Sequence, residues 1–280
     1  MLQVRFLGRR VLAAKSPITM ASRLPLRVYY DLLSQPSRAV LMFLKVTGIP
    51  HVERPVALRR GEHKSEEFTK LNPMQKVPVI VDNGFILTES VAILKYLATK
   101  YNVPQFWYPQ DVFQRAKVDE YMAWQHANVR FHAAKVFILE VLIPKASGQA
   151  VDQDKLNKAV SELSTTLDLL ESMFLKNQRF LCGEQITLGD ILAICELMQM
   201  TVPPQAKPFN PKVADDTTII GLISEIDVTC YQREPLGANR DILQDRPKLV
   251  AWHDRVRSFI GKPFDEVHSY LYQLRNKARL

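Results

Sequence analysis

The hydroxyl of Ser34 is the first group along this sequence that could take part in chemistry. It follows an alternating apolar and polar segment, Leu26–Tyr30, and precedes Pro36, so it stands where a strand gives way to a helix. The N–H groups and the dipole at a helix start favour an anion beside the hydroxyl, here a thiolate. The alternative is a plain N-cap, in which the hydroxyl only satisfies the backbone N–H groups.

Two other chemistries are excluded at this turn. A nucleophilic serine would need a Gly-x-Ser-x-Gly elbow or a neighbouring histidine and acid, and the sequence shows neither. A thiol–disulfide oxidoreductase would need Cys-x-x-Cys, whereas Ser34 and Ser37 occupy the two cysteine positions. The turn can therefore only donate or accept hydrogen bonds.

Val77-Pro78 comes directly before another predicted strand. A proline there often has a cis peptide bond that leaves the preceding backbone N–H and C=O free to pair with an extended peptide. The alternative is an ordinary edge-strand proline. A peptide ladder at Val77 is thus one of two interpretations.

Glu89 and Ser90 open the next predicted helix. The helix N–H groups and the Ser90 hydroxyl could bind a carboxylate, and Glu89 could bind an ammonium. A capping arrangement that begins at Thr88 is the alternative.

Three basic residues, His63, Lys76 and Arg130, could reach a second carboxylate or a sulfur, although each alone is more often a solvated surface group. Taken together, these groups suit a short extended peptide with a carboxylate at each end, a free amine and a thiol. Glutathione is such a peptide.

The segments that position these residues predict two kinds of domain. Residues 26–101 read as β-α-β-α-β-β-α, with Asn83-Gly84 between two apolar runs as a hairpin signal. This order predicts an α/β domain with a mixed four-stranded sheet. Helical periodicity then continues almost to the end and predicts an all-α domain, with helices expected at residues 111–142, 154–175, 188–199, 247–259 and 265–277.

Four motifs in this order resemble theta-class glutathione transferases: residues 32–40, 71–78, 87–93 and 118–126. The similarity runs from about residue 26 to 199 and resumes from 235 to about 268. It implies the glutathione transferase fold, a thioredoxin-like N-terminal domain followed by an all-helical domain. It also implies a homodimer that conjugates glutathione to small, mostly hydrophobic electrophiles.

The resemblance also implies roles for single residues. Ser34 would donate a hydrogen bond to the glutathione sulfur, and Arg130 would face the thiolate. Lys76, Val77, Glu89 and Ser90 would hold the peptide, and His63 would contact its glycine carboxylate. Thr187 and Asp190 also match the family, but their spacing predicts a reciprocal helix cap with a structural role.

The composition of the 280 residues adds further expectations. The net charge is +8, but six basic residues and no acid lie within residues 1–30, so the rest is nearly neutral and a nucleic-acid partner is not expected. No apolar run approaches the roughly 18–20 residues that span a bilayer, so no membrane partner is expected. The cysteines form no Cys-x-x-Cys pair and the histidines no cluster, so neither a metal nor a cofactor is expected, and glutathione is a co-substrate.

We expect four parts along the chain: a basic extension at 1–24, a glutathione-binding domain at 25–103, a linker at 104–110 and a helical domain at 111–280. Residues 200–234 depart from the family pattern and are interpreted as a surface insertion. We expect a cytoplasmic protein, or a mitochondrial one if the Arg-rich extension is a transit peptide, with Met20 as a second possible start. The alternative function is a non-catalytic ligand-binding or interaction protein that the insertion has inactivated.

Overall fold

The computed structural model describes residues 24–200, 242–243 and 245–277. All but the last residue of the predicted extension at 1–24 and all but the first residue of the predicted insertion at 200–234 lie outside the described residues.

The N-terminal part is built on a four-stranded mixed sheet with the order β2-β1-β3-β4. The strands are β1 (Leu26–Tyr30), β2 (His51–Pro55), β3 (Val79–Asp82) and β4 (Phe85–Leu87). Strand β1 is parallel to β2 and antiparallel to β3, and β3 is antiparallel to β4. The predicted α/β class and mixed sheet are confirmed.

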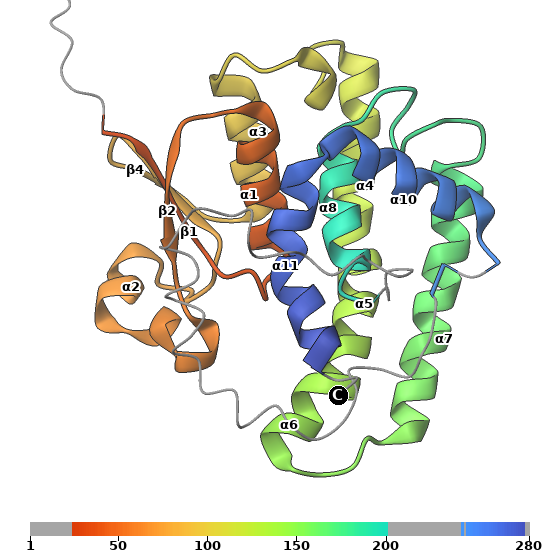
Figure 1. The fold of residues 1–280 in the computed structure, drawn as a ribbon. Helices are drawn as coiled ribbons and strands as arrows, with labels where there is room; N and C mark the ends of the chain where they lie inside the picture. Colours follow the sequence, from red (N-terminus) through yellow and green to blue (C-terminus); the bar gives the residue numbers. More distant parts are fainter. Residues whose placement is uncertain (1–23, 201–241, 244, 278–280) are drawn as a thin grey trace, which may run out of the picture.

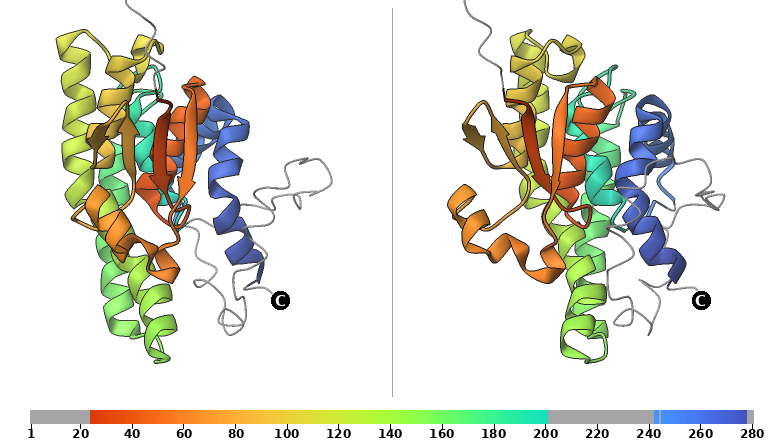
Figure 2. Two further views of the ribbon diagram at one scale, coloured as in Figure 1. Left: turned by 90° about the vertical axis from the view of Figure 1, so that its left-hand side faces the viewer. Right: turned by 60° about the vertical axis from the view of Figure 1, so that its left-hand side comes forward.

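Helices cover both faces of this sheet. They are α1 (Gln35–Thr47), α2 (Glu66–Leu71) and α3 (Ser90–Lys100), with short 3-10 turns η1 (Leu58–Arg60), η2 (Glu62–Lys64) and η3 (Gln105–Trp107). Helices α1 and α3 lie between the sheet and the helical part, and α2 lies on the other face (Figures 1 and 2).

The two faces follow from the alternation of side chains along β1. Leu26 and Val28 point into the large core, which continues through α1 into the helical part. Tyr29 points the other way and meets Phe68 of α2 edge to face, with the ring centroids 6.4 Å apart. One strand thus joins a large core to a small one.

The rest of the described chain is helical. Its elements are α4 (Val112–Ala127), α5 (Val129–Phe137), the π turn η4 (Ile138–Leu142), α6 (Ile143–Ser147), α7 (Gln153–Leu169), the π turn η5 (Leu170–Phe174), α8 (Leu188–Leu197), α10 (Pro247–Ile260) and α11 (Lys262–Lys277). The predicted all-α domain is confirmed, and α8 packs against α1 on the sheet side.

The single helix predicted at 111–142 is wrong. The helix is interrupted at Asn128, between α4 and α5, because the backbone of this residue leaves the helical region at φ −115° and ψ −87°. The Asn128 side chain donates to the carbonyl of Trp124 at 2.8 Å, which replaces a backbone hydrogen bond of the helix. The last helix also begins three residues earlier than predicted, at Lys262, with Pro263 in its first turn.

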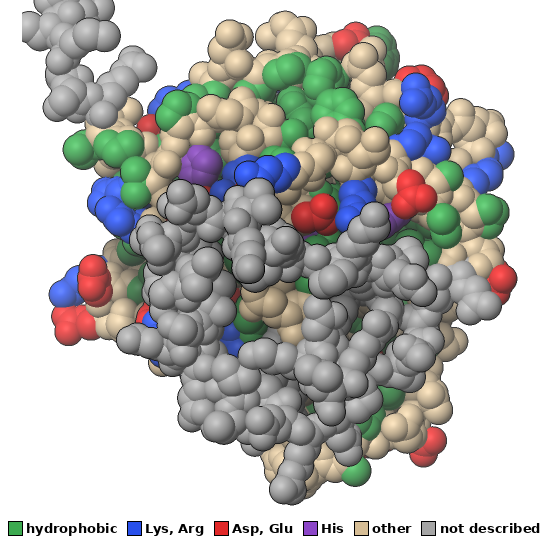
Figure 3. All heavy atoms as spheres, in the orientation of Figure 1, with side chains coloured by type: hydrophobic (Ala, Val, Ile, Leu, Met, Phe, Trp, Pro, Cys, Tyr) green, Lys and Arg blue, Asp and Glu red, His purple; other side chains and the backbone are tan. Residues whose placement is uncertain are grey.

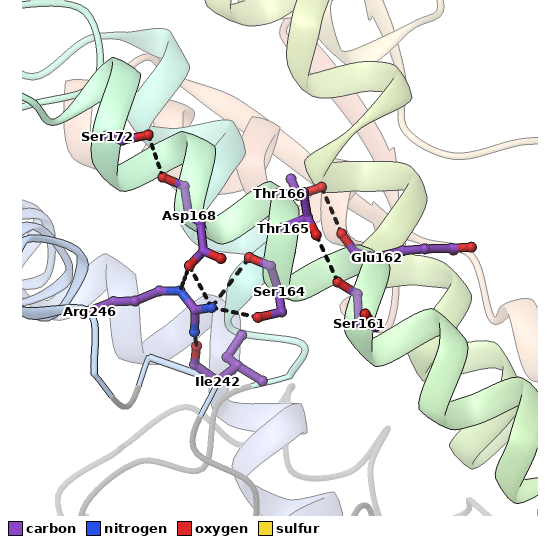
Figure 4. A network of polar contacts seen from close by, with 9 residues as sticks. All are labelled: Ser161, Glu162, Ser164, Thr165, Thr166, Asp168, Ser172, Ile242 and Arg246. Carbon is purple, nitrogen blue, oxygen red and sulfur yellow. Dashed lines mark hydrogen bonds and ion pairs between the residues drawn. The ribbon is translucent and has the colours of Figure 1, made fainter.

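Arg246 joins α7 to the segment before α10 (Figure 4). Its guanidinium donates to Asp168 at 2.9 Å and to the hydroxyl of Ser164 at 2.7 Å, both on α7. It also donates to the carbonyl of Ile242 at 3.0 Å. Among the helices that the structure describes, none is long and apolar enough to cross a membrane.

Candidate functional site

Four segments of the chain meet at one edge of the sheet, where β1, β2 and β4 end and β3 begins. The register places the end of β1 beside the end of β2, through Tyr30 and Pro55, and beside the start of β3, through Tyr29 and Val79. Strand β4 ends at the same edge because Leu87 pairs with Ile80.

This edge gathers most of the predicted site residues. Ser34 follows β1, and His63 lies on the loop after β2. Lys76 and Val77 precede β3, and Glu89 and Ser90 follow β4. The topology therefore brings together residues that are as much as 56 positions apart in the sequence. Arg130 is not among them, because it lies on α5 in the helical part.

Ser34 is the N-cap of α1, and its Oγ accepts a hydrogen bond from the N–H of Ser37 at 3.4 Å. The capping hydrogen bond of the alternative interpretation is therefore present, but it is long. It also uses only a lone pair of the oxygen, so the hydroxyl hydrogen can still be donated to a ligand. Ser34 is half-buried at the start of a helix with no acidic residue in its first turn.

Asp31 fixes the loop that carries Ser34. One carboxylate oxygen accepts from the N–H of Leu33 at 2.7 Å, and the other accepts from the N–H of Leu58 at 2.9 Å. The carboxylate thereby joins the loop after β1 to the turn η1 after β2.

The Val77–Pro78 peptide bond is cis, as the first interpretation of this motif predicts. The segment before it is braced by Asn72, which is buried. Its side-chain amide donates to the carbonyl of Lys76 at 2.7 Å, and its Oδ1 accepts from the N–H of Met74 at 3.0 Å. Lys76 itself is exposed.

Glu89 has an unusual backbone, with φ +65° and ψ 110°. It is the N-cap of α3, and its side chain makes no capping hydrogen bond, so the capping alternative is not supported. A non-glycine residue held at positive φ is strained, and such strain clusters at ligand-binding sites. The start of α3 is therefore suited to an anion, with Ser90 as its first helical residue.

His63 lies half-buried in the turn η2. Its Nδ1 is buried and has no hydrogen-bond partner among the described residues. A buried polar atom without a partner is costly, and such an atom is one sign of a residue with a functional role.

Arg130 lies on α5, and its Nη1 contacts Oε1 of Glu196 on α8 at 3.0 Å. The arginine side chain is 36% exposed and the glutamate 3%. Burial raises the pKa of Glu196 to about 7, although the charges of Arg130 and Arg38 pull it down. A guanidinium held between solvent and a buried acid can stabilise a nearby anion.

Two residues of this arrangement have no role in the predictions from sequence. Arg38 is fully buried in the first turn of α1, and Glu196 is buried in α8. The sequence shows each as a charged residue next to an apolar run. Such a residue is expected to be paired when it is buried. The partner of each residue could not be read from the sequence.

The described cysteines are not suited to nucleophilic chemistry. Burial raises the pKa of the Cys195 thiol to about 12 and that of Cys182 well above its ordinary value. Within the described ranges, no group of three or more His, Cys, Asp or Glu side chains could hold a metal ion.

Family models match both parts of the chain. Residues 26–99 match the glutathione S-transferase N-terminal domain, and residues 148–255 match the glutathione S-transferase C-terminal domain. The first match contains the sheet and its site edge, and the second contains α7, α8 and most of α10. The architecture is that of a glutathione S-transferase.

Individual relatives make the class more specific. The chain is 39% identical to glutathione S-transferase theta-1 of Bos taurus over 252 residues, which is 90% of each chain. It is 37% identical to theta-3 of Mus musculus over 256 residues, which covers 91% of this chain and 92% of the relative. The chain therefore belongs to the glutathione S-transferase family, in its theta class.

Solved structures agree with this assignment. Human glutathione S-transferase T1-1 in its apo form superposes with a TM-score of 0.73 at 39% identity, covering 91% of both chains. Human glutathione transferase theta-2 in complex with glutathione gives a TM-score of 0.74 at 35% identity, covering 91% of this chain and 90% of that one.

Proposed function

We propose that this protein conjugates the thiolate of glutathione to small, mostly hydrophobic electrophiles. One observation carries the proposal: four segments meet at a single sheet edge, where the Ser34 hydroxyl, which donates to no other described residue, lies at the start of α1. The chain's theta-class relatives include a human enzyme solved in complex with glutathione.

We assign the peptide-binding roles along this edge. The backbone of Val77 pairs with the extended tripeptide, and Ser90 with the α3 N-terminus binds the carboxylate of the γ-glutamyl end. Glu89 binds the ammonium at that end. His63 and Lys76 bind the glycine carboxylate at the other end.

Ser34 and Arg130 act on the sulfur. Ser34 donates its hydroxyl hydrogen, and Arg130 supplies positive charge from the helical side. The nucleophile is the sulfur of the substrate, and Ser34 forms no covalent bond. Glutathione is a co-substrate, and the mechanism uses no cofactor.

The energies agree with this assignment. A free thiol with a pKa near 8.5 is only a few per cent ionised at neutral pH, and lowering its pKa by about two units requires roughly 2.7 kcal/mol. One hydroxyl bond to a charged sulfur contributes about 1.5–3 kcal/mol. The α1 N-terminus and the Arg130 guanidinium contribute the remainder.

The test compares Ser34→Ala with Ser65→Ala in conjugation assays over several electrophiles. Ser65 caps α2 in the same way, with Oγ accepting from the N–H of Phe68 at 3.2 Å, so its loss controls for a missing cap. We expect Ser34→Ala to lower kcat about 10- to 100-fold with little change in glutathione affinity, because one charge-assisted bond is lost. We expect Ser65→Ala to keep its kcat.

Two outcomes would contradict the proposal. Full activity in Ser34→Ala would remove Ser34 from the mechanism. Binding of glutathione by the wild-type protein without turnover of any electrophile would favour the alternative, a non-catalytic ligand-binding or interaction protein.

We propose a homodimer, because Phe85 and Ile86 on the edge strand β4, and Met74 in the segment before β3, leave large apolar side chains exposed. A monomeric mass in light scattering at working concentration would refute it.

We propose no nucleic-acid partner, because basic and acidic side chains are interspersed on the uncovered part of the face in Figure 3. Retention of DNA or RNA at physiological salt would contradict this.

We propose two domains, at residues 25–103 and 111–280, joined by a linker at 104–110. Limited proteolysis would test these limits.

We also propose a cytoplasmic location. Import of a reporter into mitochondria by residues 1–24 would replace it with the mitochondrial alternative.

A further inference from the structure

Arg38 is a fully buried cation, four residues after Ser34 in the first turn of α1. Its Nη1 donates to the carbonyls of Leu32 at 2.8 Å and Leu33 at 3.2 Å. Its Nη2 donates to the carbonyl of Cys195 at 2.8 Å and to Oε1 of Gln199 at 2.8 Å. One guanidinium therefore bridges the loop before Ser34 and the end of α8.

No carboxylate accepts a hydrogen bond from this guanidinium among the described residues, and the charge of Glu196 acts on it only through space. A buried charge held by neutral oxygens is costly, and an apolar side chain of similar volume often serves stability as well. What an apolar side chain could not do is hold two backbone carbonyls of the loop and two oxygens of the helical part through hydrogen bonds from one group.

The fixed loop is the one that carries the Ser34 hydroxyl. Leu33 is its direct neighbour, and the Ser34 N–H donates to the carbonyl of Asp31 at 3.0 Å, so the turn is held at both ends. On the other side of the bridge, Glu196 follows Cys195 in α8 and holds Arg130. Arg38 thus donates to the carbonyl of the residue that precedes Ser34 and to the carbonyl of the residue that precedes Glu196, the partner of Arg130.

We propose that Arg38 is a positioning residue for the conjugation reaction, which holds the Ser34 hydroxyl at a fixed place relative to α8 and Arg130. The inference rests on the proposed function. Arg38 does not touch the sulfur, because its side chain is 0% exposed and both terminal nitrogens donate to protein oxygens. It acts through the loop, since a hydrogen bond to the thiolate weakens when its donor shifts by a fraction of an ångström.

The experiment measures the pKa of the glutathione thiol bound to the full chain, from the ultraviolet absorbance of the thiolate as a function of pH. In Arg38→Gln we expect this pKa to rise by about one unit, with kcat at pH 6.5 about tenfold lower and recovering at high pH. The KM for glutathione should change less than about threefold, because the peptide-binding residues are untouched. In a Ser34→Ala background, Arg38→Gln should have no further effect on the thiol pKa.

Arg246→Gln is the matched control. Arg246 is also an arginine that bridges two elements through backbone and side-chain oxygens, but its hydrogen bonds join α7 to the segment before α10 (Figure 4), and none of them goes to α1 or to the loop before it. The Arg246→Gln substitution should lower the unfolding temperature and leave the pKa of the bound glutathione thiol unchanged. If Arg38→Gln fails to fold, Arg38→Lys and Gln199→Leu test the same bridge, since each removes only part of it, and both should raise the thiol pKa.

The inference is overturned if the folded Arg38 variants bind glutathione with the wild-type thiol pKa, or if Arg38→Gln raises that pKa equally with and without Ser34. A wild-type protein that leaves the thiol pKa at its value in free solution would instead overturn the proposed function itself. The two failures are therefore distinguishable.

Discussion

Glu196 shows how a single residue links the stability of the protein to the chemistry of its site. It lies in the buried run of α8, where burial raises its pKa to about 7, and its only hydrogen-bonded cation among the described residues is Arg130. Near neutral pH this carboxyl is about half ionised. The Arg130 guanidinium therefore faces a neutral acid at lower pH and a carboxylate at higher pH.

The sign of the effect on stability follows from the raised pKa. Below pH 4.5 the carboxyl is protonated in both the folded and the unfolded chain. Between pH 4.5 and about 7 the unfolded chain loses this proton first, so the free energy of unfolding falls as pH rises and levels off above about 7.

We predict that Glu196→Gln removes this decline. Its unfolding free energy, measured in urea from pH 4.5 to 8, should equal or exceed that of the wild type at pH 8, because Arg130 is partly solvated and tolerates a neutral neighbour. Glu162→Gln is the control, since its ion pair with Lys135 lowers the pKa of Glu162 and stability is lost there on acidification. Wild-type and Glu196→Gln curves that run parallel through pH 5–7 would refute the prediction.

At the scale of elements, the start of α8 ties three parts of the helical domain together. The predicted reciprocal cap between Thr187 and Asp190 is confirmed. Asp190 also accepts from the indole N–H of Trp252 on α10 at 2.8 Å and from the N–H of Leu181 at 2.9 Å. The spacing of the cap was readable in the sequence, whereas the bond to Trp252, 62 residues away, was not.

Gly189, inside this cap, tests how tightly α8 packs. A Cβ at this position would lie 2.8 Å from Cδ1 of Tyr121 and 3.0 Å from Sγ of Cys182. In an exposed helix, replacing glycine by alanine stabilises by about 1 kcal/mol. Here overpacking should reverse the sign, so Gly189→Ala should lower the free energy of unfolding by about 1–3 kcal/mol.

Urea unfolding of Gly189→Ala checks this, together with Gly189→Ala/Cys182→Ala, in which the shortened side chain at 182 should restore part of the loss. A Gly189→Ala variant at least as stable as the wild type would show that Tyr121 and Cys182 move aside freely.

The elements that the sequence predicted well are those with local causes. The hairpin followed from Asn83 and Gly84, which adopt φ +50° and +86°. The cis bond at Val77-Pro78 was one of the two interpretations of that motif. The break between α4 and α5 was missed because Asn128 acts through its side chain on the backbone, which periodicity does not register. The bridge of Arg38 to α8 spans 157 residues, so only its charge beside an apolar run could have pointed to it.

At the scale of the whole molecule, α11 returns to the N-terminal part and closes the fold. Phe264, Val267 and Leu271 on α11 belong to the large core. Figure 2 shows α11 alongside the layer of α1, and its Glu266 pairs with Lys45 of α1 at 3.5 Å. The last described helix thus packs against the helix that begins at Ser34.

A second contact joins α11 to the loop that carries His63. The Arg59 guanidinium lies over the ring of Tyr270, 4.5 Å from its centroid. Arg59 is in η1, and His63 follows in η2. Because a cation–π contact contributes about 0.5–1 kcal/mol at exposed sites, its loss should loosen this loop without unfolding it.

We predict that Arg59→Gln raises the KM for glutathione about two- to fivefold with kcat unchanged, since the role that we propose for His63 is a contact with the peptide and not with the sulfur. Tyr270→Leu should have the same effect, and the double variant should be no worse than either single one. Arg60→Gln is the matched control, because Arg60 pairs with Glu62 within the same loop at 2.8 Å and does not reach α11 through that bond. Steady-state kinetics at varied glutathione distinguish the outcomes: an equal rise in KM for Arg60→Gln, or additive effects in the double variant, would mean that α11 does not hold the loop through this pair.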